Sequence, residues 1–429
     1  MPTATAANTA HRVTWLDDSG MQHSAGWRSL AGHPAPARVR AVGDELGADE
    51  AYRLIDSGTA LLWLGDYQNA HHLLQALGRR VDSRLAHEKQ TPGRPKFFSS
   101  PSGGRTPQRG GLGGALQPRP RSAPPAHAAA SAKGSLKQAF FAQRQAQAMR
   151  ARILGGLLLP FDADHGVPLR RAPDLRQPGL QAHGSAAEHY VASLRELLGL
   201  VGAFEWRKKG VKIPALGAAI HPHHGVFSPV RGEYVDLVAR SPLPLAAGTQ
   251  GAFDIGTGTG VLALVLAQRG LRVTATDLSA AALACAADNV GRLGLAGSVT
   301  LQSADLFPHG ANSRAGLVVC NPPWLPAPPS SPLEAAVYDP DSAMLRGFLA
   351  GLAAHLAPGG EGWLILSDLA EHLGLRSREE LLGWIGAAGL QVLGRLDARP
   401  THRKVANTSD PLHAARAAEL TSLWRLGAA

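Results

Sequence analysis

From about residue 246 onward, short apolar runs of β type alternate with stretches of helical periodicity. Alternating strands and helices form a mostly parallel sheet with helices on both faces. Pro400 and Pro411 interrupt the last connection, so we expect a hairpin there and an antiparallel final strand. The sequence therefore predicts an α/β fold with a doubly wound sheet. The expected strands are 252–255, 273–276, 298–302, 316–320, 362–366, 391–396 and 420–426.

The part of the chain before this pattern differs in its periodicity. Asp66 is a candidate N-cap, and apolar residues from Tyr67 to Val81 recur at helical spacing behind it. Further helices are expected around 141–153 and from Tyr190 to Val201. We therefore expect a mainly helical N-terminal domain, made of a region at 1–88 and its continuation at 136–204. A β-hairpin connector at 205–245 would lead into the α/β domain at 246–429.

The positive charge of the chain is concentrated in one place. The net charge is +10, from 43 Lys and Arg against 33 Asp and Glu, and residues 89–153 hold 12 of the basic residues and no acid. The remaining 31 basic residues (43 − 12) nearly balance the 33 acids. Within this run, residues 89–135 are rich in Pro, Gly, Ser and Arg, which predicts a disordered insert. It is either a solvated linker or a loose attractor of RNA phosphates.

Several features indicate the compartment and exclude some classes of protein. Cys285 and Cys320 are the two cysteines, too few for a disulfide framework. Cys320 is expected to be a small core residue. The start of the chain lacks the apolar core of a signal peptide, and no apolar run reaches membrane-spanning length. We expect a soluble cytoplasmic protein with no membrane contact.

A glycine-rich turn follows the first expected strand, in the sequence Asp-Ile-Gly-Thr-Gly-Thr-Gly at 254–260. Its GxGxG spacing, with an acid two residues earlier, differs from the GxGxxG of dinucleotide sites. Asp277 ends the second strand, where it could bind ribose hydroxyls, and Asp305 ends the third. Three acids at neighbouring strand ends suit a cationic nucleoside and disfavour a phosphate ligand.

The fourth expected strand ends in Asn321-Pro322-Pro323-Trp324. Prolines lack an N–H, so main-chain carbonyls beside them are free to accept hydrogen bonds. Asn321 adds an amide, and Trp324 offers a flat face for a planar group. The combination suits a planar NH2 nucleophile, because accepting both hydrogens would draw its lone pair out of conjugation.

With these motifs, the segment from Phe227 to Leu426 resembles the class I S-adenosylmethionine-dependent methyltransferases of the Asn-Pro-Pro-aromatic group. This group includes release-factor and ribosomal-protein glutamine methyltransferases and enzymes that methylate exocyclic amines of adenine or guanine. The resemblance implies a Rossmann-like seven-stranded sheet with an antiparallel last strand and S-adenosylmethionine as cofactor. It implies catalytic roles for Asn321, Pro322, Pro323 and Trp324, and cofactor binding by Asp254, Gly256, Thr257, Gly258, Gly260, Asp277, Leu278, Asp305, Leu306 and Asn321.

The sequence departs from the glutamine methyltransferases of this group at two places. They commonly carry Tyr after the prolines, where this chain has Trp324. They also carry Pro-Arg-Pro-Glu-Thr before the catalytic domain, where this chain reads Phe-Ser-Pro-Val-Arg-Gly-Glu at 227–233. Phe227, Pro229 and Arg231 are the expected substrate contacts.

The methyl acceptor stays open at this point. It could be an exocyclic amine in ribosomal or transfer RNA, a glutamine in a translation protein, or adenine in DNA. A non-catalytic module that binds the cofactor or RNA is a further alternative. The basic cluster of Arg207, Lys208, Lys209 and Lys212 could contact RNA or be a solvated strand edge. We expect no metal site, because His221, His223 and His224 have no carboxylate or cysteine at ligand spacing.

Overall fold

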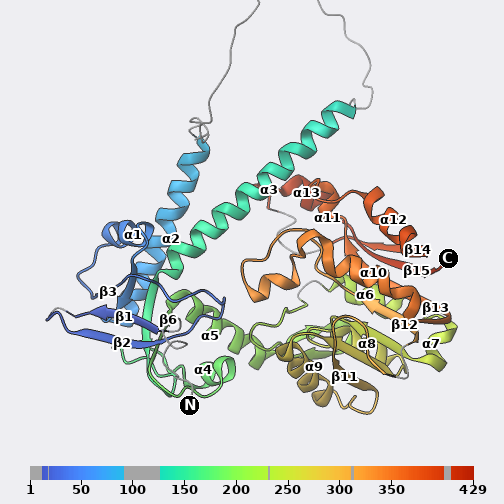
Figure 1. Ribbon diagram of the computed structural model, residues 1–429, viewed down its shortest axis with the longest axis horizontal. Helices are drawn as coiled ribbons and strands as arrows, with labels where there is room; N and C mark the ends of the chain where they lie inside the picture. Colours follow the sequence, from blue (N-terminus) through green and yellow to red (C-terminus); the bar gives the residue numbers. More distant parts are fainter. Residues whose placement is uncertain (1–11, 18, 91–125, 230–231, 311–313, 401–406) are drawn as a thin grey trace, which may run out of the picture.

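The computed structural model describes residues 12–17, 19–90, 126–229, 232–310, 314–400 and 407–429. Two sheet-containing halves, at residues 12–209 and 232–429, are joined by a small hairpin (Figure 1). The insert predicted at 89–135 lies mostly outside the described residues. Among the residues that are described, no helix combines the length and apolar character needed to cross a membrane.

The C-terminal half is built on a seven-stranded sheet in the order β11-β10-β9-β12-β13-β15-β14. The pairs from β11 to β13 are parallel, and β15 runs antiparallel to both of its neighbours. This confirms the predicted doubly wound sheet and its antiparallel last strand. The strands are β9 (Ala252–Ile255), β10 (Val273–Asp277), β11 (Val299–Ser303), β12 (Ala315–Cys320), β13 (Leu356–Ser367), β14 (Leu390–Ala398) and β15 (Thr421–Ala428).

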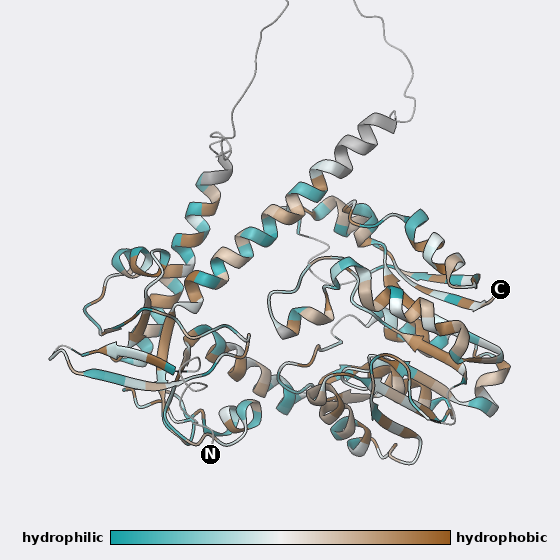
Figure 2. Ribbon diagram, viewed as in Figure 1, coloured by the Kyte–Doolittle hydropathy of each residue, from teal (hydrophilic) through white to brown (hydrophobic). Residues whose placement is uncertain are grey.

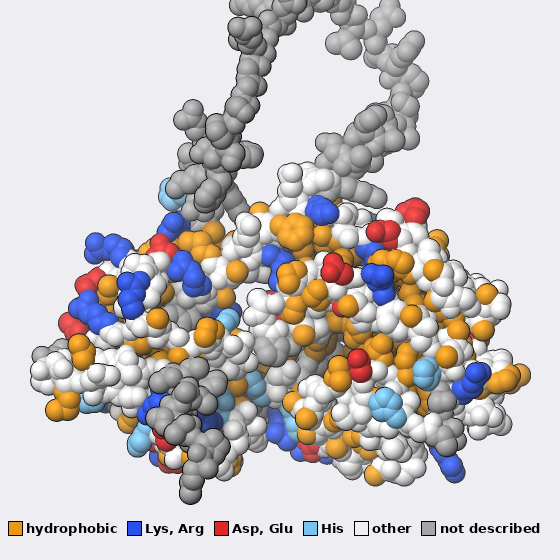
Figure 3. Space-filling view, viewed as in Figure 1, with side chains coloured by type: hydrophobic (Ala, Val, Ile, Leu, Met, Phe, Trp, Pro, Cys, Tyr) orange, Lys and Arg blue, Asp and Glu red, His pale blue; other side chains and the backbone are white. Residues whose placement is uncertain are grey.

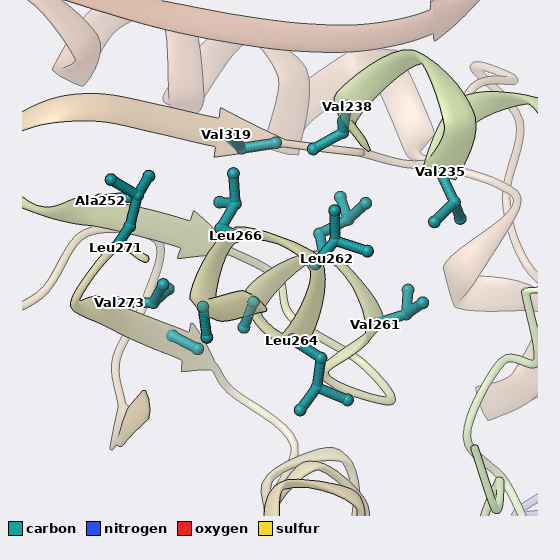
Figure 4. Close-up of a cluster of buried hydrophobic side chains, with 14 of the residues drawn as sticks. Val235, Val238, Ala252, Val261, Leu262, Leu264, Leu266, Leu271, Val273 and Val319 are labelled. Atoms are coloured by element: carbon teal, nitrogen blue, oxygen red, sulfur yellow. The ribbon is translucent and has the colours of Figure 1, made fainter. Parts of the chain in front are cut away.

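Helices cover both faces of this sheet. Leu317 and Val319 of β12 point into one hydrophobic cluster, whereas Val318 and Cys320 point into another, because successive side chains of a strand alternate. Both faces therefore need an apolar cover, and Figure 4 shows the cover that α6 and α8 give to one face. The helices are α6 (Glu233–Arg240), α7 (Leu245–Gln250), α8 (Val261–Gln268), α9 (Ala280–Arg292), α10 (Ala343–His355), α11 (Leu369–His372), α12 (Arg378–Ala387) and α13 (His413–Ala418).

Helix α8 is apolar on all sides. Each residue from 261 to 267 is buried, as expected of a helix with no polar face. Hydrophobic colour dominates the strands of the large sheet, while hydrophilic residues recur along α2 and α3 (Figure 2). The turn that begins α8 is thus held on a rigid, fully packed support.

The N-terminal half contains a six-stranded sheet that the sequence analysis missed. Its order is β1-β2-β6-β5-β4-β3, with β3, β4 and β5 mutually parallel. The helices predicted here are present, but they pack on this sheet, so the half is α/β and not simply helical. Its strands are β1 (Arg12–Leu16), β2 (Gln22–Trp27), β3 (Val39–Val42), β4 (Ala60–Trp63), β5 (Leu157–Phe161) and β6 (Tyr190–Ser193).

The central strands were missed because they are short and buried on both faces. β4 reads ALLW and β5 reads LLLPF. Leu61 and Trp63 face the helices, whereas Ala60 and Leu62 face the cluster on the other side. A short continuous apolar run has no alternation, so periodicity cannot distinguish it from part of a buried helix.

The N-terminal helices are close to the expected ones, with one correction at Tyr190. This residue was expected to start a helix but lies in β6, and the helix starts at Leu194 behind the N-cap Ser193. The helices of this half are α1 (Ala48–Asp56), α2 (Tyr67–Gln90), α3 (Ala126–Gly155), α4 (Arg176–His183) and α5 (Leu194–Lys209).

The connector is shorter than predicted. Residues 205–209 belong to the last turns of α5, and Gly210, at a φ of +74°, ends the helix. Three basic residues in that last turn, 207–209, favour a helix C-terminus because of the helix dipole. The hairpin itself consists of β7 (Val211–Ile213), the 3-10 turn η2 (Pro214–Leu216) and β8 (Ala218–Ile220). The basic cluster therefore lies mainly on a helix and not on a strand edge.

Candidate functional site

The glycine turn at 256–260 joins the end of β9 to the start of α8. Gly256, Gly258 and Gly260 have φ angles of +70°, +56° and +82°, which side chains with a Cβ rarely adopt. A Cβ on Gly256 would also lie 2.6 Å from the Met344 methyl carbon, whereas one on Gly258 would meet no atom within 4 Å. The turn therefore presents bare backbone to the space above the sheet.

A buried carboxylate, that of Asp254, supports this turn from below. Its Oδ2 accepts hydrogen bonds from Thr257 Oγ1 at 2.6 Å and from the Ala263 amide of α8 at 3.0 Å. The side chain is only 1% exposed, and burial raises its pKa to about 6. Asp254 therefore joins the strand, the turn and the first turn of the helix.

A second carboxylate, Asp277 at the end of β10, holds the turn from the side. Its Oδ2 accepts from the Gly258 amide at 3.0 Å, and its Oδ1 accepts from the Ser279 amide at 2.9 Å. β10 pairs in parallel with β9, so the carboxyl ends of the two strands meet at one edge. Asp277 is half-buried and keeps acceptor capacity toward the cavity.

The ends of β11 and β12 complete this edge of the sheet. Asp305 follows β11 and is exposed, and Leu306 beside it has a φ of +69°. After β12, Trp324 Nε1 donates a hydrogen bond to Asn321 Oδ1 at 2.9 Å. Because an indole N–H can only donate, it fixes the orientation of the Asn321 amide. A carbonyl oxygen has two lone pairs, so Asn321 Oδ1 can still accept one more hydrogen bond.

The segment 325–339, which follows the Asn-Pro-Pro-Trp loop, folds back over the site. The Leu325 amide donates to the Val337 carbonyl at 3.2 Å, and the Asp339 amide donates to the Leu325 carbonyl at 2.9 Å. The Asp339 carboxylate then accepts from the Met344 and Leu345 amides and caps α10. The segment is thus anchored at both of its ends.

Helix α3 of the N-terminal half packs on this segment. Arg144 Nη2 donates to the Pro328 carbonyl at 2.6 Å and lies 3.4 Å from Glu334 Oε2. The Arg144 guanidinium also stacks 3.8 Å from the centre of the Tyr338 ring. Phe140, one turn earlier, is 4% exposed in a cluster with Leu325. The N-terminal half therefore helps to build the site.

These elements enclose a cavity of about 1190 Å³. Its volume exceeds the roughly 300–1,000 Å³ typical of a site for one small molecule. Most of the predicted site residues line it: Asp254, Gly256, Thr257, Gly258, Asp277, Leu278, Asp305, Leu306, Asn321, Pro322, Pro323, Trp324 and Phe227.

Of the predicted site residues that the structure describes, Gly260 and Pro229 do not line the cavity. Gly260 packs toward α9, where its Cβ would lie 3.2 Å from that of Ala286. Pro229 is buried elsewhere, and Arg231 lies outside the described residues. The wall formed by α3 and by segment 325–339 was not predicted from the sequence. No local motif marks α3, because it joins the cavity only through tertiary packing. Its lining residues are Phe140, Gln143, Arg144 and Gln147.

The remaining candidate residues have structural contacts. His221 Nδ1 meets the Arg207 carbonyl at 2.7 Å, and His223 Nε2 meets Asp288 Oδ2 at 3.1 Å. No group of three or more His, Cys, Asp or Glu in the described ranges could hold a metal ion. Cys320 is fully buried in the core, and burial raises its pKa.

The basic cluster is partly neutralised. Arg207 Nη2 lies 3.3 Å from Asp288 Oδ2, while Lys208, Lys209 and Lys212 are exposed. The Lys and Arg side chains over α1 and α2 in Figure 3 also have acidic side chains among them, and Arg80 pairs with Asp49 there. The described surface over α1 and α2 therefore carries both basic and acidic side chains.

The family comparison falls in the C-terminal part of the chain. A family model described as "Methyltransferase small domain" matches residues 217–377. A release factor glutamine methyltransferase of Cereibacter sphaeroides is 36% identical over 162 residues, covering 34% of this chain and 55% of that protein. A ribosomal protein L11 methyltransferase of Rhizobium etli is 32% identical over 148 residues, covering 34% and 43%. The chain thus spans about half the length of these curated relatives.

A solved structure of ribosomal protein L11 methylase from Lactobacillus delbrueckii subsp. bulgaricus is also similar. It is 16% identical, with a TM-score of 0.32, and the match covers 49% of this chain and 85% of that one. The family match over residues 217–377 includes the glycine turn, Asp277 and the Asn-Pro-Pro-Trp loop. Residues 12–209 lie outside the family match.

We expect Asp254→Asn to gain stability relative to the wild type as pH rises. Asp254 has a folded-state pKa of about 6 against an ordinary value of 3.8, because burial disfavours its charge. Between these values the folded state keeps a proton that the unfolded state has lost, so stability falls as pH rises through this window. The full loss is about 3 kcal/mol. Urea unfolding of both proteins at about pH 4 and about pH 7 measures the difference.

Asp288→Asn is the matched control with the opposite sign. Burial acts to raise the pKa of Asp288, but hydrogen bonds from His223 and Arg292 outweigh it and the pKa is lowered. The wild type should therefore gain stability relative to this variant as pH rises toward 3.8, and the difference should change little between pH 4 and pH 7. If the free energy of unfolding differs between Asp254→Asn and wild type by the same amount at both pH values, the prediction that burying the Asp254 charge costs stability is wrong.

Proposed function

We propose that this protein transfers a methyl group from S-adenosylmethionine to the side-chain amide nitrogen of a glutamine in a translation-related protein. One observation carries the proposal: Asn321 and Pro322 line the same cavity as the glycine turn and the three carboxylates at the strand ends. That arrangement supports the proposal, because acceptors for an NH2 group would then lie beside a site suited to a cationic nucleoside. The transfer is a direct displacement held in a single cavity.

The residues present fit the cofactor. Gly258 leaves open space where a side chain would project, so backbone can approach a bound molecule there. Asp277 would accept from the ribose hydroxyls, the glycine turn above Asp254 would hold the methionine part, and Leu278 and Asp305 would border the adenine. When bound, the cofactor supplies an electrophilic methyl group on a cationic sulfur. The acids around the cavity match that positive charge.

The chain's own groups would prepare the acceptor nitrogen. Asn321 Oδ1 and the Pro322 carbonyl would each accept one N–H of the planar amide, and Trp324 would lie against its plane. Two such hydrogen bonds draw the nitrogen lone pair out of conjugation and toward the methyl group. The nitrogen gains the methyl group and loses one proton, which passes to solvent. Catalysis in this scheme rests on positioning and on preorganised acceptors.

A protein acceptor is favoured over RNA by two observations. The named relatives act on a release factor and on ribosomal protein L11, which are both proteins of translation. Of the basic cluster, Arg207 is already paired with Asp288. An exocyclic amine of RNA would use the same acceptors, so an RNA acceptor is the alternative outcome of the ribonuclease experiment.

Asn321→Ala should abolish methyl transfer while cofactor affinity stays within about twofold of wild type. The variant removes one of the two acceptors for the amide hydrogens, and removing one preorganised group typically costs about 100-fold or more in rate. Transfer of radiolabelled methyl groups and calorimetry of cofactor binding give the two readouts. Asn69→Ala, in the N-terminal half, serves as the control. Retained turnover in Asn321→Ala would refute the role of this side chain.

Asp277→Ala should weaken cofactor binding by about tenfold or more. A carboxylate that accepts from hydroxyl groups contributes about 1.5–3 kcal/mol, and 1.4 kcal/mol corresponds to a factor of ten. Calorimetry with S-adenosylmethionine measures the change. Asp288→Ala changes a carboxylate that does not line the cavity and should bind normally. Equal affinities in all three proteins would contradict the ribose contact.

The acceptor class can be tested in a lysate of the source organism. The protein is incubated with radiolabelled cofactor, with and without ribonuclease, and the products are separated on a gel. We expect label in protein bands that survives ribonuclease, with Asn321→Ala as the blank. Label that disappears with ribonuclease would identify RNA as the acceptor and overturn the glutamine proposal.

A further inference from the structure

Helix α3, in the other half of the chain, lines the same cavity as the Asn-Pro-Pro-Trp loop. A primary amide has two N–H donors and one carbonyl acceptor. The loop can serve the N–H groups, because Asn321 Oδ1 and the Pro322 carbonyl accept. Its two prolines have no N–H, and the Trp324 N–H is already bonded to Asn321. The loop thus offers few donors for the carbonyl oxygen of the acceptor amide, and a donor from another element would hold that oxygen.

Two glutamines on α3 can supply that donor. Gln143 and Gln147 are four residues apart, so they lie on one face of the helix, and both line the cavity. Neither side chain makes a hydrogen bond to another group among the described residues. Two arginines of the same cavity each have one nitrogen paired: Arg144 Nη2 with Pro328 and Glu334, and Arg416 Nε with Asp410.

The helix is held firmly enough to position these amides. Phe140 is buried in a cluster with Leu325 and Leu373 of the other half. Arg144, between the two glutamines, binds the Pro328 carbonyl and stacks on Tyr338. The contacts of Phe140, which precedes Gln143, and of Arg144, which lies between the two glutamines in sequence, fix the distance of α3 from segment 325–339. A donor on such a support can discriminate between acceptors, because its position is set in advance.

We propose that Gln143 and Gln147 are specificity-determining residues that bind the carbonyl of the acceptor amide and the peptide carrying it. This inference rests on the proposed function, because it assumes an amide acceptor held by Asn321. It assigns the N-terminal half a direct part in substrate recognition. A protein segment would enter the cavity beside the contact between α3 and segment 325–339, with its target side chain pointing toward the glycine turn.

The test compares Gln143→Ala, Gln147→Ala and the double variant with wild type, using a purified bacterial release factor as the methyl acceptor. We expect the KM for the acceptor to rise about tenfold in the double variant, because neutral hydrogen bonds contribute about 0.5–1.5 kcal/mol each. The affinity for S-adenosylmethionine, measured by calorimetry, should not change. Gln145→Ala, on the exposed face of the same helix and away from the cavity, should behave as wild type.

Gln143→Glu separates hydrogen-bond donation from shape. Glutamate has nearly the same size but cannot donate when ionised, so it should raise the KM at least as much as Gln143→Ala does. If wild type methylates the release factor and all the α3 variants match it, the inference is wrong and the proposed function stands. If wild type binds the cofactor but labels no protein, the proposed glutamine acceptor fails, and this inference fails with it.

Discussion

The carboxylate of Asp254 is the interaction on which the site depends. It accepts hydrogen bonds from the turn at Thr257 and from the first turn of α8 at Ala263, while fully covered by the core. Burying this charge costs stability, since its pKa is raised to about 6. The two hydrogen bonds offset part of this cost, and they hold the strand, the turn and the helix in one arrangement. Asp277 then fixes the turn from the neighbouring strand, so two acids shape the backbone that faces the cavity.

The parallel sheet explains why residues far apart in the chain meet at one edge. The carboxyl ends of β9, β10, β11 and β12 lie side by side, and each is followed by a residue that lines the cavity. Ligands bind at this edge in open α/β sheets because the loops diverge there. Segment 325–339 and α3 then close the far side. The N-terminal half is thereby part of the site, through Arg144 and Phe140.

Predictions from sequence succeeded where a local pattern had one physical meaning. The alternation of strands and helices after residue 246 gave the correct sheet, and the glycine turn, Asp277, Asp305 and Asn321 all line the cavity. They failed for β4 and β5, which are apolar on both faces and so carry no alternation. Residues 205–209 were predicted to belong to a hairpin, but they form the end of α5. The end of this helix is set by Gly210, and the helix itself begins far upstream at Leu194.

The sequence by itself determined the doubly wound C-terminal sheet, its antiparallel last strand and the residues at its strand ends. Those features follow from hydrophobic periodicity and from glycine and proline chemistry, which act over a few residues. Only the tertiary structure decided that α3 packs on segment 325–339, that α3 lines the same cavity as the Asn-Pro-Pro-Trp loop, and that Gly260 stays outside the cavity. Arg144 and Pro328 are 184 residues apart, and no local pattern encodes a contact that arises when two separately folded surfaces pack together.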